Sequence, residues 1–373
     1  MANFALAHAA GTAWKSICEE CLAELAQHEN ESGFEKLGLV YISDHLAGEA
    51  KKIIALLRIK TGISDWVGSV GIGICATGHE YFDQPAIAIL ITDFPPDSFR
   101  LLETQESPGD LPASIADWAR SRESRFGIVH ADPRNGDILD IIAGLAESLD
   151  GFLVGGLTSS RGELAQISGE VTSAGVSGVL LAGDVPVVTA LSQSCMPIAA
   201  RRQITACENN VLIELDSRPA LDVFKEDIGE LLARDLQRVA GYIFAALPIA
   251  NSDTGDYLVR NLTGIDEERH LLAIGELVEP GQTIQFCRRD AEAAETDLVR
   301  MLSDLKKRLD APAKGGVYFS CLGRGPNMFG NASQELKIIE RELGDVPLVG
   351  FFCNGEISHH RLYTYTGVLT LFT

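Results

Sequence analysis

A guanidinium and a carboxylate near the end of the chain have the chemistry needed to hold the two ends of an amino acid. Arg324 lies between Gly323 and Gly325, in a polar loop that follows a short apolar run. In such a loop its guanidinium can form a bidentate contact with a carboxylate or phosphate. Glu356 follows a second apolar run and can accept an ammonium group. The alternative roles are a surface or interface salt bridge for Arg324 and a cap or turn for Glu356.

The loops that carry these two charges also carry small and polar residues that suit the same site. They complete the predicted ligand site together with one upstream arginine: Cys321, Gly323, Gly325, Asn354, Gly355 and Arg288. Glycines after a buried run allow a close approach to the backbone, although turn chemistry alone also explains them. Arg288, which Arg289 and Asp290 follow, ends a predicted strand, and a solvated strand end is its simpler interpretation.

Two cysteines in the same region offer a different chemistry. Cys321 and Cys353 end two predicted core strands, and His359 and His360 follow the second strand in sequence. A thiolate forms at neutral pH when a base is near, so a Cys–His pair would make a hydrolase or transferase. Zinc is a further alternative, but no tight pair of ligands occurs. Because free cysteines are mostly buried and inert, we expect packed thiols, no catalytic residue and no metal.

The elements that must position these residues belong to a unit that occurs three times. Each copy has a strand, a helix and a second apolar strand, and the paired strands are 37–43 with 66–69, 126–130 with 153–156, and 316–320 with 346–351. Each copy also contains a Val-Gly pair and, further on, a Gly shortly before a Glu. The repeat predicts that Gly68, Gly155 and Gly350 occupy equivalent corners.

Composition and charge restrict the class of protein. The chain has 373 residues, of which 46% are hydrophobic and 22% charged, as in soluble globular proteins of more than one domain. The formal net charge of −21 argues against a nucleic acid or an anionic membrane surface as partner. No segment approaches the roughly 18 apolar residues of a membrane span, and no cationic leader is recognisable. We therefore expect a cytoplasmic protein, and the eight scattered cysteines suit a reducing compartment.

Two short motifs invite cofactor chemistry but lack the surroundings it needs. Cys18 and Cys21 have the spacing of metal ligands, yet they lie on the apolar face of a predicted helix at 13–28, without a second ligand pair nearby. The glycine-rich run from Gly68 to Gly73 leads toward another strand, whereas a dinucleotide site must open a helix. The sequence therefore predicts no cofactor.

The alternation of apolar strands with amphipathic helices predicts an α/β fold. We expect two related lobes with mixed, largely antiparallel sheets flanked by helices, which contain the strand-helix-strand repeat. Hairpin-like stretches exclude a wholly parallel sheet. An N-terminal helical segment at 1–36 would precede domains at 37–208 and 209–373, with the division near residues 200–212. Because domain interfaces favour ligand sites, the ligand cleft is expected between the lobes.

Several motifs, in the right order, resemble those of the FIST family. They are Ser320-Cys321-Leu322-Gly323-Arg324-Gly325, Phe329-Gly330, the run at 350–357, Val154-Gly155-Gly156, and the stretches 192–198, 257–260 and 286–290. Ser194 departs from the family, which more usually has Gly at that position. The resemblance covers most of the chain from about Leu37 onward, so that 37–208 is FIST N-like and 209–373 is FIST C-like.

The resemblance implies a sensory domain that binds a small ligand such as an amino acid. Few residues lie outside the two halves, so we expect the protein to signal through a separate partner protein. Two other functions remain open at this point. One is a thiol-dependent hydrolase or transferase that uses Cys321 or Cys353, and the other is a scaffold that binds another protein.

Overall fold

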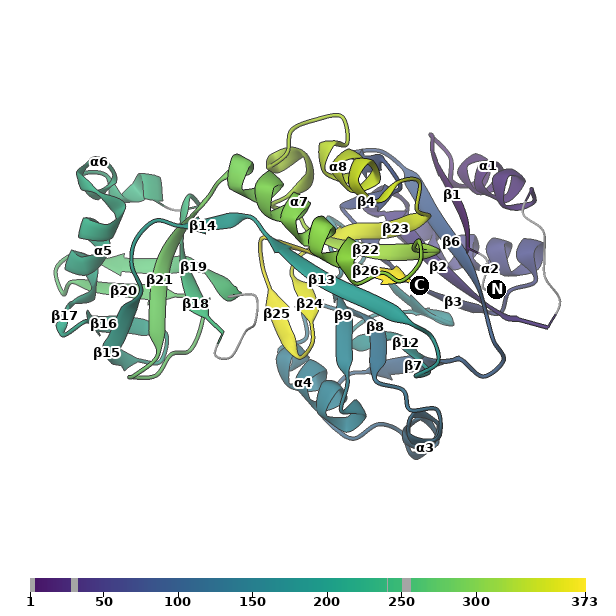
Figure 1. Ribbon diagram of the computed structural model, residues 1–373, viewed down its shortest axis with the longest axis horizontal. Helices are drawn as coiled ribbons and strands as arrows, with labels where there is room; N and C mark the ends of the chain where they lie inside the picture. Colours follow the sequence, from purple (N-terminus) through teal and green to yellow (C-terminus); the bar gives the residue numbers. More distant parts are fainter. Residues whose placement is uncertain (1–3, 28–32, 240, 250–255) are drawn as a thin grey trace. The chain divides into compact units, whose positions relative to one another are not determined.

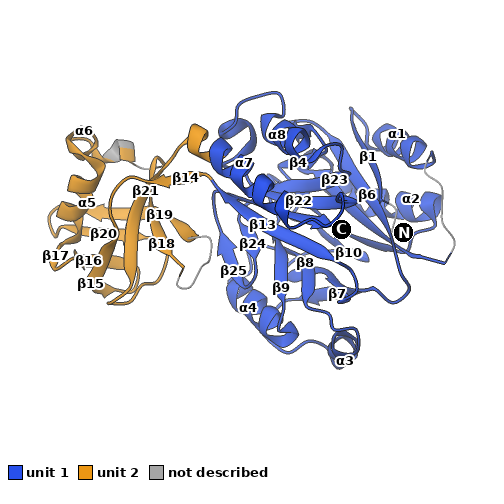
Figure 2. Ribbon diagram, in the orientation of Figure 1, with its two compact units in different colours: residues 1–193, 295–373 blue, residues 194–294 orange. Residues whose placement is uncertain are grey.

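The structure, a computed structural model, describes residues 4–27, 33–239, 241–249 and 256–373 (Figure 1). Contacts divide the chain into unit 1, which comprises Met1–Gln193 and Glu295–Thr373, and unit 2, Ser194–Ala294 (Figure 2). Unit 2 is thus inserted into unit 1, whereas the two expected sequence halves follow one another. The α/β class with mixed sheets flanked by helices is confirmed. None of the helices in the described ranges is long and apolar enough to cross a membrane.

Unit 1 consists of three copies of one arrangement, which runs strand, helix, strand, helix, strand, hairpin and closing strand. The first copy comprises β1 (Phe4–Ala10), α1 (Trp14–Leu25), β2 (Glu35–Ser43), α2 (Ala50–Thr61), β3 (Asp65–Gly71), β4 (Gly73–Ala76), β5 (His79–Phe82) and β6 (Ala86–Phe94). The second comprises β7 (Phe99–Gln105), α3 (Ala113–Ser121), β8 (Phe126–Ala131), α4 (Ile138–Leu149), β9 (Phe152–Leu157), β10 (Gln166–Ser168), β11 (Glu170–Thr172) and β12 (Val176–Leu181). The third comprises β13 (Val187–Gln193), α7 (Ala291–Lys307), β22 (Gly315–Cys321), α8 (Gln334–Leu343), β23 (Leu348–Cys353), β24 (Glu356–Ser358), β25 (Arg361–Tyr363) and β26 (Thr366–Phe372).

Each copy builds a six-stranded sheet that is completed by the hairpin of another copy. The strand orders are β1-β6-β2-β3-β10-β11, β7-β12-β8-β9-β24-β25 and β13-β26-β22-β23-β4-β5. In every sheet the two central strands are parallel and the closing strand is antiparallel. The first copy therefore lends its hairpin to the third, the third to the second, and the second to the first, which closes a ring of pairings.

Alternating residues of the central strands face two different cores, as the period of two in a strand requires. On β2, Leu39 and Tyr41 enter a core shared by all three sheets, whereas Val40 and Ile42 pack against α1 and α2. Corresponding cores lie under α3 and α4 and under α7 and α8. The helix pairs thus cover one face of each sheet (Figure 1).

The three repeat glycines occupy equivalent positions, as the sequence predicts, but within strands rather than at corners. They are paired with the neighbouring parallel strand as Gly68 with Val40, Gly155 with Val129, and Gly350 with Tyr318. In all three, an added Cβ would lie 1.7 Å from the carbonyl oxygen of that partner. A side chain at this position would therefore prevent the two strands from pairing.

The Gly-Glu part of the predicted repeat is wrong. Glu356 begins β24, where it pairs with Gly156. Glu80 lies instead on β5, in the second strand of its hairpin, and Glu163 lies in the loop before β10. The three glutamates follow glycines at similar sequence distances, but the hairpins place them at different points of the sheets.

Equivalent residues of β2, β8 and β22, the first of the two parallel strands in each copy, meet in the shared core. Tyr41 Oη lies 3.2 Å from His130 Nε2, and both rings pack edge-on against Phe319. Burial lowers the pKa of His130 to about 3, so the imidazole is neutral at physiological pH. Its Nδ1 has no hydrogen-bond partner in the described part of the chain.

Acidification is expected to destabilise the protein through His130. Its pKa is about 3 when folded and 6.5 in the reference state, so the unfolded chain binds more protons between these values. Above pH 6.5 His130 is neutral in both states and does not lower the free energy of unfolding. As the pH falls from 6.5 toward 3, the free energy of unfolding decreases by about 1.4 kcal/mol per pH unit. Urea unfolding between pH 7 and 4 should show a shallower decline for Tyr41→Phe/His130→Phe than for Tyr41→Phe. Parallel curves would contradict the assignment.

Unit 2 is a closed antiparallel barrel with a helix against it. Its elements are β14 (Cys195–Pro197), β15 (Arg202–Glu208), β16 (Val211–Leu215), β17 (Arg218–Pro219), α5 (Ala220–Ile228), α6 (Glu230–Ala233), β18 (Ile243–Pro248), β19 (Tyr257–Asp266), β20 (Leu271–Ile274) and β21 (Thr283–Arg289). The ladder β21-β15-β16-β20-β19-β18 closes because β18 also pairs with β21. Phe224 of α5 packs against Phe286 of β21, with ring centroids 4.7 Å apart.

Candidate functional site

The carboxyl ends of two parallel strands hold all predicted site residues except Arg288. Cys321 ends β22 and lies opposite Cys353, the last residue of β23. The loop after β22 carries Gly323, Arg324 and Gly325, and the residues after β23 are Asn354, Gly355 and Glu356. Ligands of α/β sheets commonly bind beyond the carboxyl ends of the strands. Arg288 belongs to unit 2, where it lies on β21 and pairs with Asp290 at 3.4 Å.

Arg324 is fully buried, and a carboxylate already compensates its charge. Its Nε donates to Glu335 Oε1 at 2.7 Å, and neither side chain is exposed. Burial acts to lower the pKa of Arg324, but the Glu335 carboxylate and Tyr318 together outweigh burial and raise it, so the guanidinium stays charged. Glu335 also accepts hydrogen bonds from Tyr318 Oη at 2.6 Å and from the backbone N–H of Gly325 at 2.8 Å. The predicted salt-bridge alternative is therefore present, inside the protein rather than on its surface.

Glu356 is equally buried, and none of the arginines or lysines in the described ranges forms a salt bridge with it. Thr366 donates to its Oε2 from the backbone N–H at 3.1 Å and from the hydroxyl at 2.7 Å. Burial raises the pKa of Glu356 to about 8, despite these hydrogen bonds, which favour the carboxylate. At neutral pH the carboxyl group is thus mostly protonated. An ammonium group would find a neutral acid here until the pH rises above about 8.

The two thiols beside Glu356 are packed and protonated. Cys353 donates to the carbonyl oxygen of Ser320 at 3.3 Å, and Cys321 Sγ accepts from the N–H of Gly323 at 3.4 Å. Burial, and then the charge of Glu356, raise the pKa of both thiols. Within the described ranges no imidazole hydrogen-bonds either sulfur. This environment favours a structural role over a nucleophilic one.

The other cysteine motif packs as expected. Cys18 and Cys21 are fully buried on the inner face of α1, and burial raises the pKa of each to about 12. Among the residues that the structure describes, no group of three or more His, Cys, Asp or Glu side chains could hold a metal ion. The glycine-rich run forms the end of β3 and the start of β4 rather than the start of a helix.

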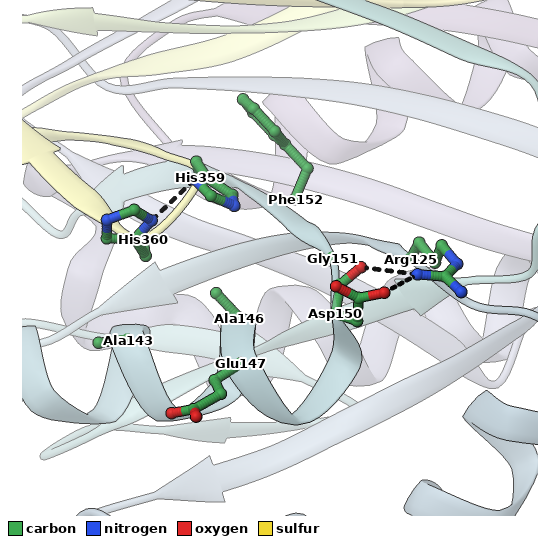
Figure 3. Close-up of a pocket in the computed structure, with 9 residues that line it drawn as sticks. All are labelled: Arg125, Ala143, Ala146, Glu147, Asp150, Gly151, Phe152, His359 and His360. Atoms are coloured by element: carbon green, nitrogen blue, oxygen red, sulfur yellow. Dashed lines mark hydrogen bonds and ion pairs between the residues drawn. The ribbon is translucent and has the colours of Figure 1, made fainter. Parts of the chain in front are cut away.

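An open pocket of about 660 Å³ lies elsewhere in unit 1 (Figure 3). It is bounded by the last turns of α4, the start of β9 and the turn between β24 and β25. Its lining consists of Arg125, Ala143, Ala146, Glu147, Asp150, Gly151, Phe152, His359 and His360. The pocket exists because the β24–β25 hairpin of the third copy sits beside β9 of the second, with Glu356 opposite Gly156.

The walls of this pocket combine an aromatic surface with charges of both signs. The rings of Phe152 and His359 stack with centroids 5.2 Å apart, and Nδ1 of His359 lies 2.7 Å from Nδ1 of His360 (Figure 3). Arg125 forms an ion pair with Asp150 and also donates to the Asp150 carbonyl oxygen at 3.2 Å. Glu147 is exposed on α4. Such a mixture suits a small ligand that carries both charge and apolar surface.

Both pocket histidines are neutral at physiological pH. Burial, followed by the nearby charge of Arg361, lowers the pKa of His359 and of His360. One imidazole must donate and the other accept across their short Nδ1 contact. The sequence suggests these histidines only as bases for a cysteine or as zinc ligands. It does not predict the pocket, because nothing local indicates that their turn lies beside β9.

The sequence matches one family along most of its length. Residues 36–218 match the FIST N domain and residues 220–359 match the FIST C domain. An uncharacterized protein of Mycobacterium tuberculosis is 32% identical over 371 residues, which covers 94% of this chain and 95% of the relative. An uncharacterized protein of Mycobacterium bovis is 31% identical over 363 residues, which covers 88% of this chain and 92% of the relative. The chain therefore belongs to the FIST family, whose domains are associated with small-ligand binding and sensory signalling.

Proposed function

We propose that this protein is a sensory protein that binds a small amino-acid-like metabolite and signals through a partner protein. The observation that carries the proposal is the pocket of Figure 3, which brings a guanidinium, two carboxylates and an aromatic wall around about 660 Å³. Small-molecule sites commonly measure about 300–1,000 Å³ and place a few polar groups among apolar ones. A partner with a basic surface would complement the net charge of −21.

Two places compete for the ligand. At the loops after β22 and β23, a ligand carboxylate would have to replace Glu335 at Arg324, and both groups are fully buried. Breaking such a pair leaves a buried charge without its partner, which costs several kcal/mol. In the pocket, Glu147 and Asp150 are exposed, and no buried interaction must be broken to reach them. We therefore place the ligand in the pocket and keep the Arg324–Glu356 loops as the second candidate.

Two matched Glu→Gln variants separate these places. Native mass spectrometry of freshly purified protein should first show a retained adduct of amino-acid size. Calorimetric titration with that compound should then show binding weakened about 10- to 100-fold in Glu147→Gln, since a charge-assisted hydrogen bond contributes about 1.5–3 kcal/mol. Glu356→Gln should bind normally, because the amide resembles the protonated acid that is present at neutral pH.

The opposite ranking of the two variants would place the ligand at the loops after β22 and β23. If both variants bind the ligand as tightly as the natural protein, neither Glu147 nor Glu356 takes part in recognising it. Failure to detect any amino-acid-like ligand, retained or added, would contradict the proposed function itself.

A further inference from the structure

The three copies of unit 1 can be compared at the position of the pocket, because each copy places the same three elements there. These elements are the last turn of the second helix, the start of the second parallel strand, and the turn of the hairpin that another copy supplies. The helices are aligned by the backbone N–H that caps each carboxyl end. Its acceptor four positions earlier is the carbonyl oxygen of Arg58 in α2, of Ala146 in α4 and of Glu340 in α8, and in α4 the same N–H also donates to Glu147.

In the first copy the protein fills this position with its own guanidinium. Arg58 Nε donates to the carbonyl oxygen of Ser64 at 3.1 Å, just before β3. Nη2 donates to the carbonyl oxygen of Gly169, in the turn of the β10–β11 hairpin, at 2.5 Å. Nη1 forms an ion pair with Glu170 at 2.9 Å. A cation thus links the strand to the borrowed hairpin.

In the third copy the same position is closed by polar contacts. Thr77, in the turn of the β4–β5 hairpin, donates through Oγ1 to the carbonyl oxygen of Val346 at 2.7 Å and accepts from the N–H of Leu348 at 2.9 Å. The Glu340 carboxylate lies against Gly78 of the same turn. The cavity that remains measures about 10 Å³, too little for any ligand.

In the second copy the filling side chain is missing. Ala146 ends at its Cβ where Arg58 extends a guanidinium, and the position is the pocket of about 660 Å³. The lining nevertheless keeps features that suit a cation. It has two carboxylates, Glu147 and Asp150, against one guanidinium, Arg125, so its net charge is one negative. The stacked Phe152 and His359 rings offer an aromatic face of the kind that attracts cations.

We propose that the pocket of the second copy binds a small organic cation, a guanidinium or alkylammonium compound, which occupies the place that Arg58 fills in the first copy. The proposal rests on the proposed function and specifies its ligand class. The ligand cation would lie near Glu147 and the aromatic face, and the carbon chain of the ligand would cover Ala143 and Ala146. The strong negative charge of the whole chain would favour the encounter with a cation.

The charge preference is tested by calorimetric titration of the full-length protein with L-arginine and L-citrulline, which differ in a charged guanidinium and a neutral urea group. We expect L-arginine to bind at least about 10-fold more tightly, as for a charge-assisted hydrogen bond. Glu147→Gln should remove most of this difference by weakening L-arginine and leaving L-citrulline unchanged. Equal affinities for both compounds in the natural protein would overturn the cation preference.

The location is tested by a variant that fills the pocket as the first copy does. Ala146→Arg should abolish binding of L-arginine, whereas Ala55→Arg, the same substitution at an exposed site of α2, should leave it unchanged. Circular dichroism melting shows whether each variant folds, and Glu147→Gln replaces Ala146→Arg if the latter does not. Unchanged binding in folded Ala146→Arg would overturn the location.

The outcomes distinguish this inference from the proposed function. If a neutral or anionic amino acid binds instead and Ala146→Arg blocks it, the proposed preference for a cation is wrong, and the pocket remains the ligand site. If L-arginine binds but neither pocket variant changes its affinity, the pocket is not the ligand site, although the protein does bind an amino acid. If no amino acid of any charge binds and none is retained on purification, both proposals fail.

Discussion

Gly350→Ala is expected to destabilise unit 1 by more than about 4 kcal/mol, a loss that single substitutions rarely reach. The added Cβ would lie 1.7 Å from the carbonyl oxygen of Tyr318, and real Cβ contacts are essentially never below 3.0 Å. Both atoms belong to, or are fixed by, the backbone of paired strands, so no side-chain rotation can relieve the contact. The β22–β23 pair would have to separate, and residues from β22 and β23 form part of the shared core.

Guanidinium chloride unfolding, followed by circular dichroism, measures this loss. Gly68→Ala and Gly155→Ala should behave alike, because their Cβ atoms meet Val40 and Val129 at the same 1.7 Å. Gly144→Ala provides the control, since this glycine lies inside α4 with nothing within 4 Å of an added Cβ. Gly144→Ala should stabilise the protein by about 0.5–1 kcal/mol, which is the usual preference of a helix for alanine over glycine. A loss below about 1 kcal/mol in Gly350→Ala would contradict the strand contact.

The repeat was predictable because its signal is local. A buried strand, a helix and a Val-Gly pair lie within a few tens of residues, and only glycine satisfies the position opposite a carbonyl oxygen. The partners of the hairpins were not predictable in the same way. β24 has three residues, and nothing in Glu356 or Ser358 specifies pairing with Gly156 and Val154, some two hundred residues earlier. The pocket depends on that pairing, so it could not be foreseen.

The division of the chain shows a similar limit. A change in composition near residues 200–212 indicates a new domain, whereas the contacts place the start of unit 2 at Ser194. The return to unit 1 occurs near Glu295, inside α7. No linker composition marks this return, because a continuous helix carries the chain from one unit to the other. The composition of the sequence therefore gives no sign of where the inserted unit ends.

The candidate charges illustrate what burial adds to residue type. Arg324 lies in the loop after β22, whereas Glu356 begins β24, and the sequence gives no sign that both side chains are fully buried. The partner of Arg324 is Glu335, in the first turn of α8. Other acidic residues of this helix, such as Glu340 and Glu342, are not buried. Exposed glutamates are the common case in helices, so a pairing that removes this one from water depends on the tertiary fold.

Arg324→Ala is therefore expected to cost about 3–5 kcal/mol of stability, which is typical when one member of a buried ion pair is removed. The Glu335 carboxylate would remain buried with hydrogen bonds from Tyr318 and Gly325 but without its neighbouring cation. Denaturant unfolding measures the loss, and Arg300→Ala serves as control. Arg300 is about half exposed in its pair with Asp297, and such surface pairs contribute only about 0–1 kcal/mol.

A second substitution separates a structural role of Arg324 from a ligand-binding one. In Arg324→Met/Glu335→Leu neither charge remains, and replacing a buried pair by apolar residues is often neutral, so much of the lost stability should return. Recovery is expected to be partial, because Tyr318 and the N–H of Gly325 lose their acceptor. If the double variant folds and binds ligand with normal affinity, the role of Arg324 is structural: it joins the loop after β22 to α8. If Arg324→Ala instead loses less than about 1 kcal/mol yet fails to bind ligand, the guanidinium belongs to the binding site and its pairing with Glu335 must open in solution.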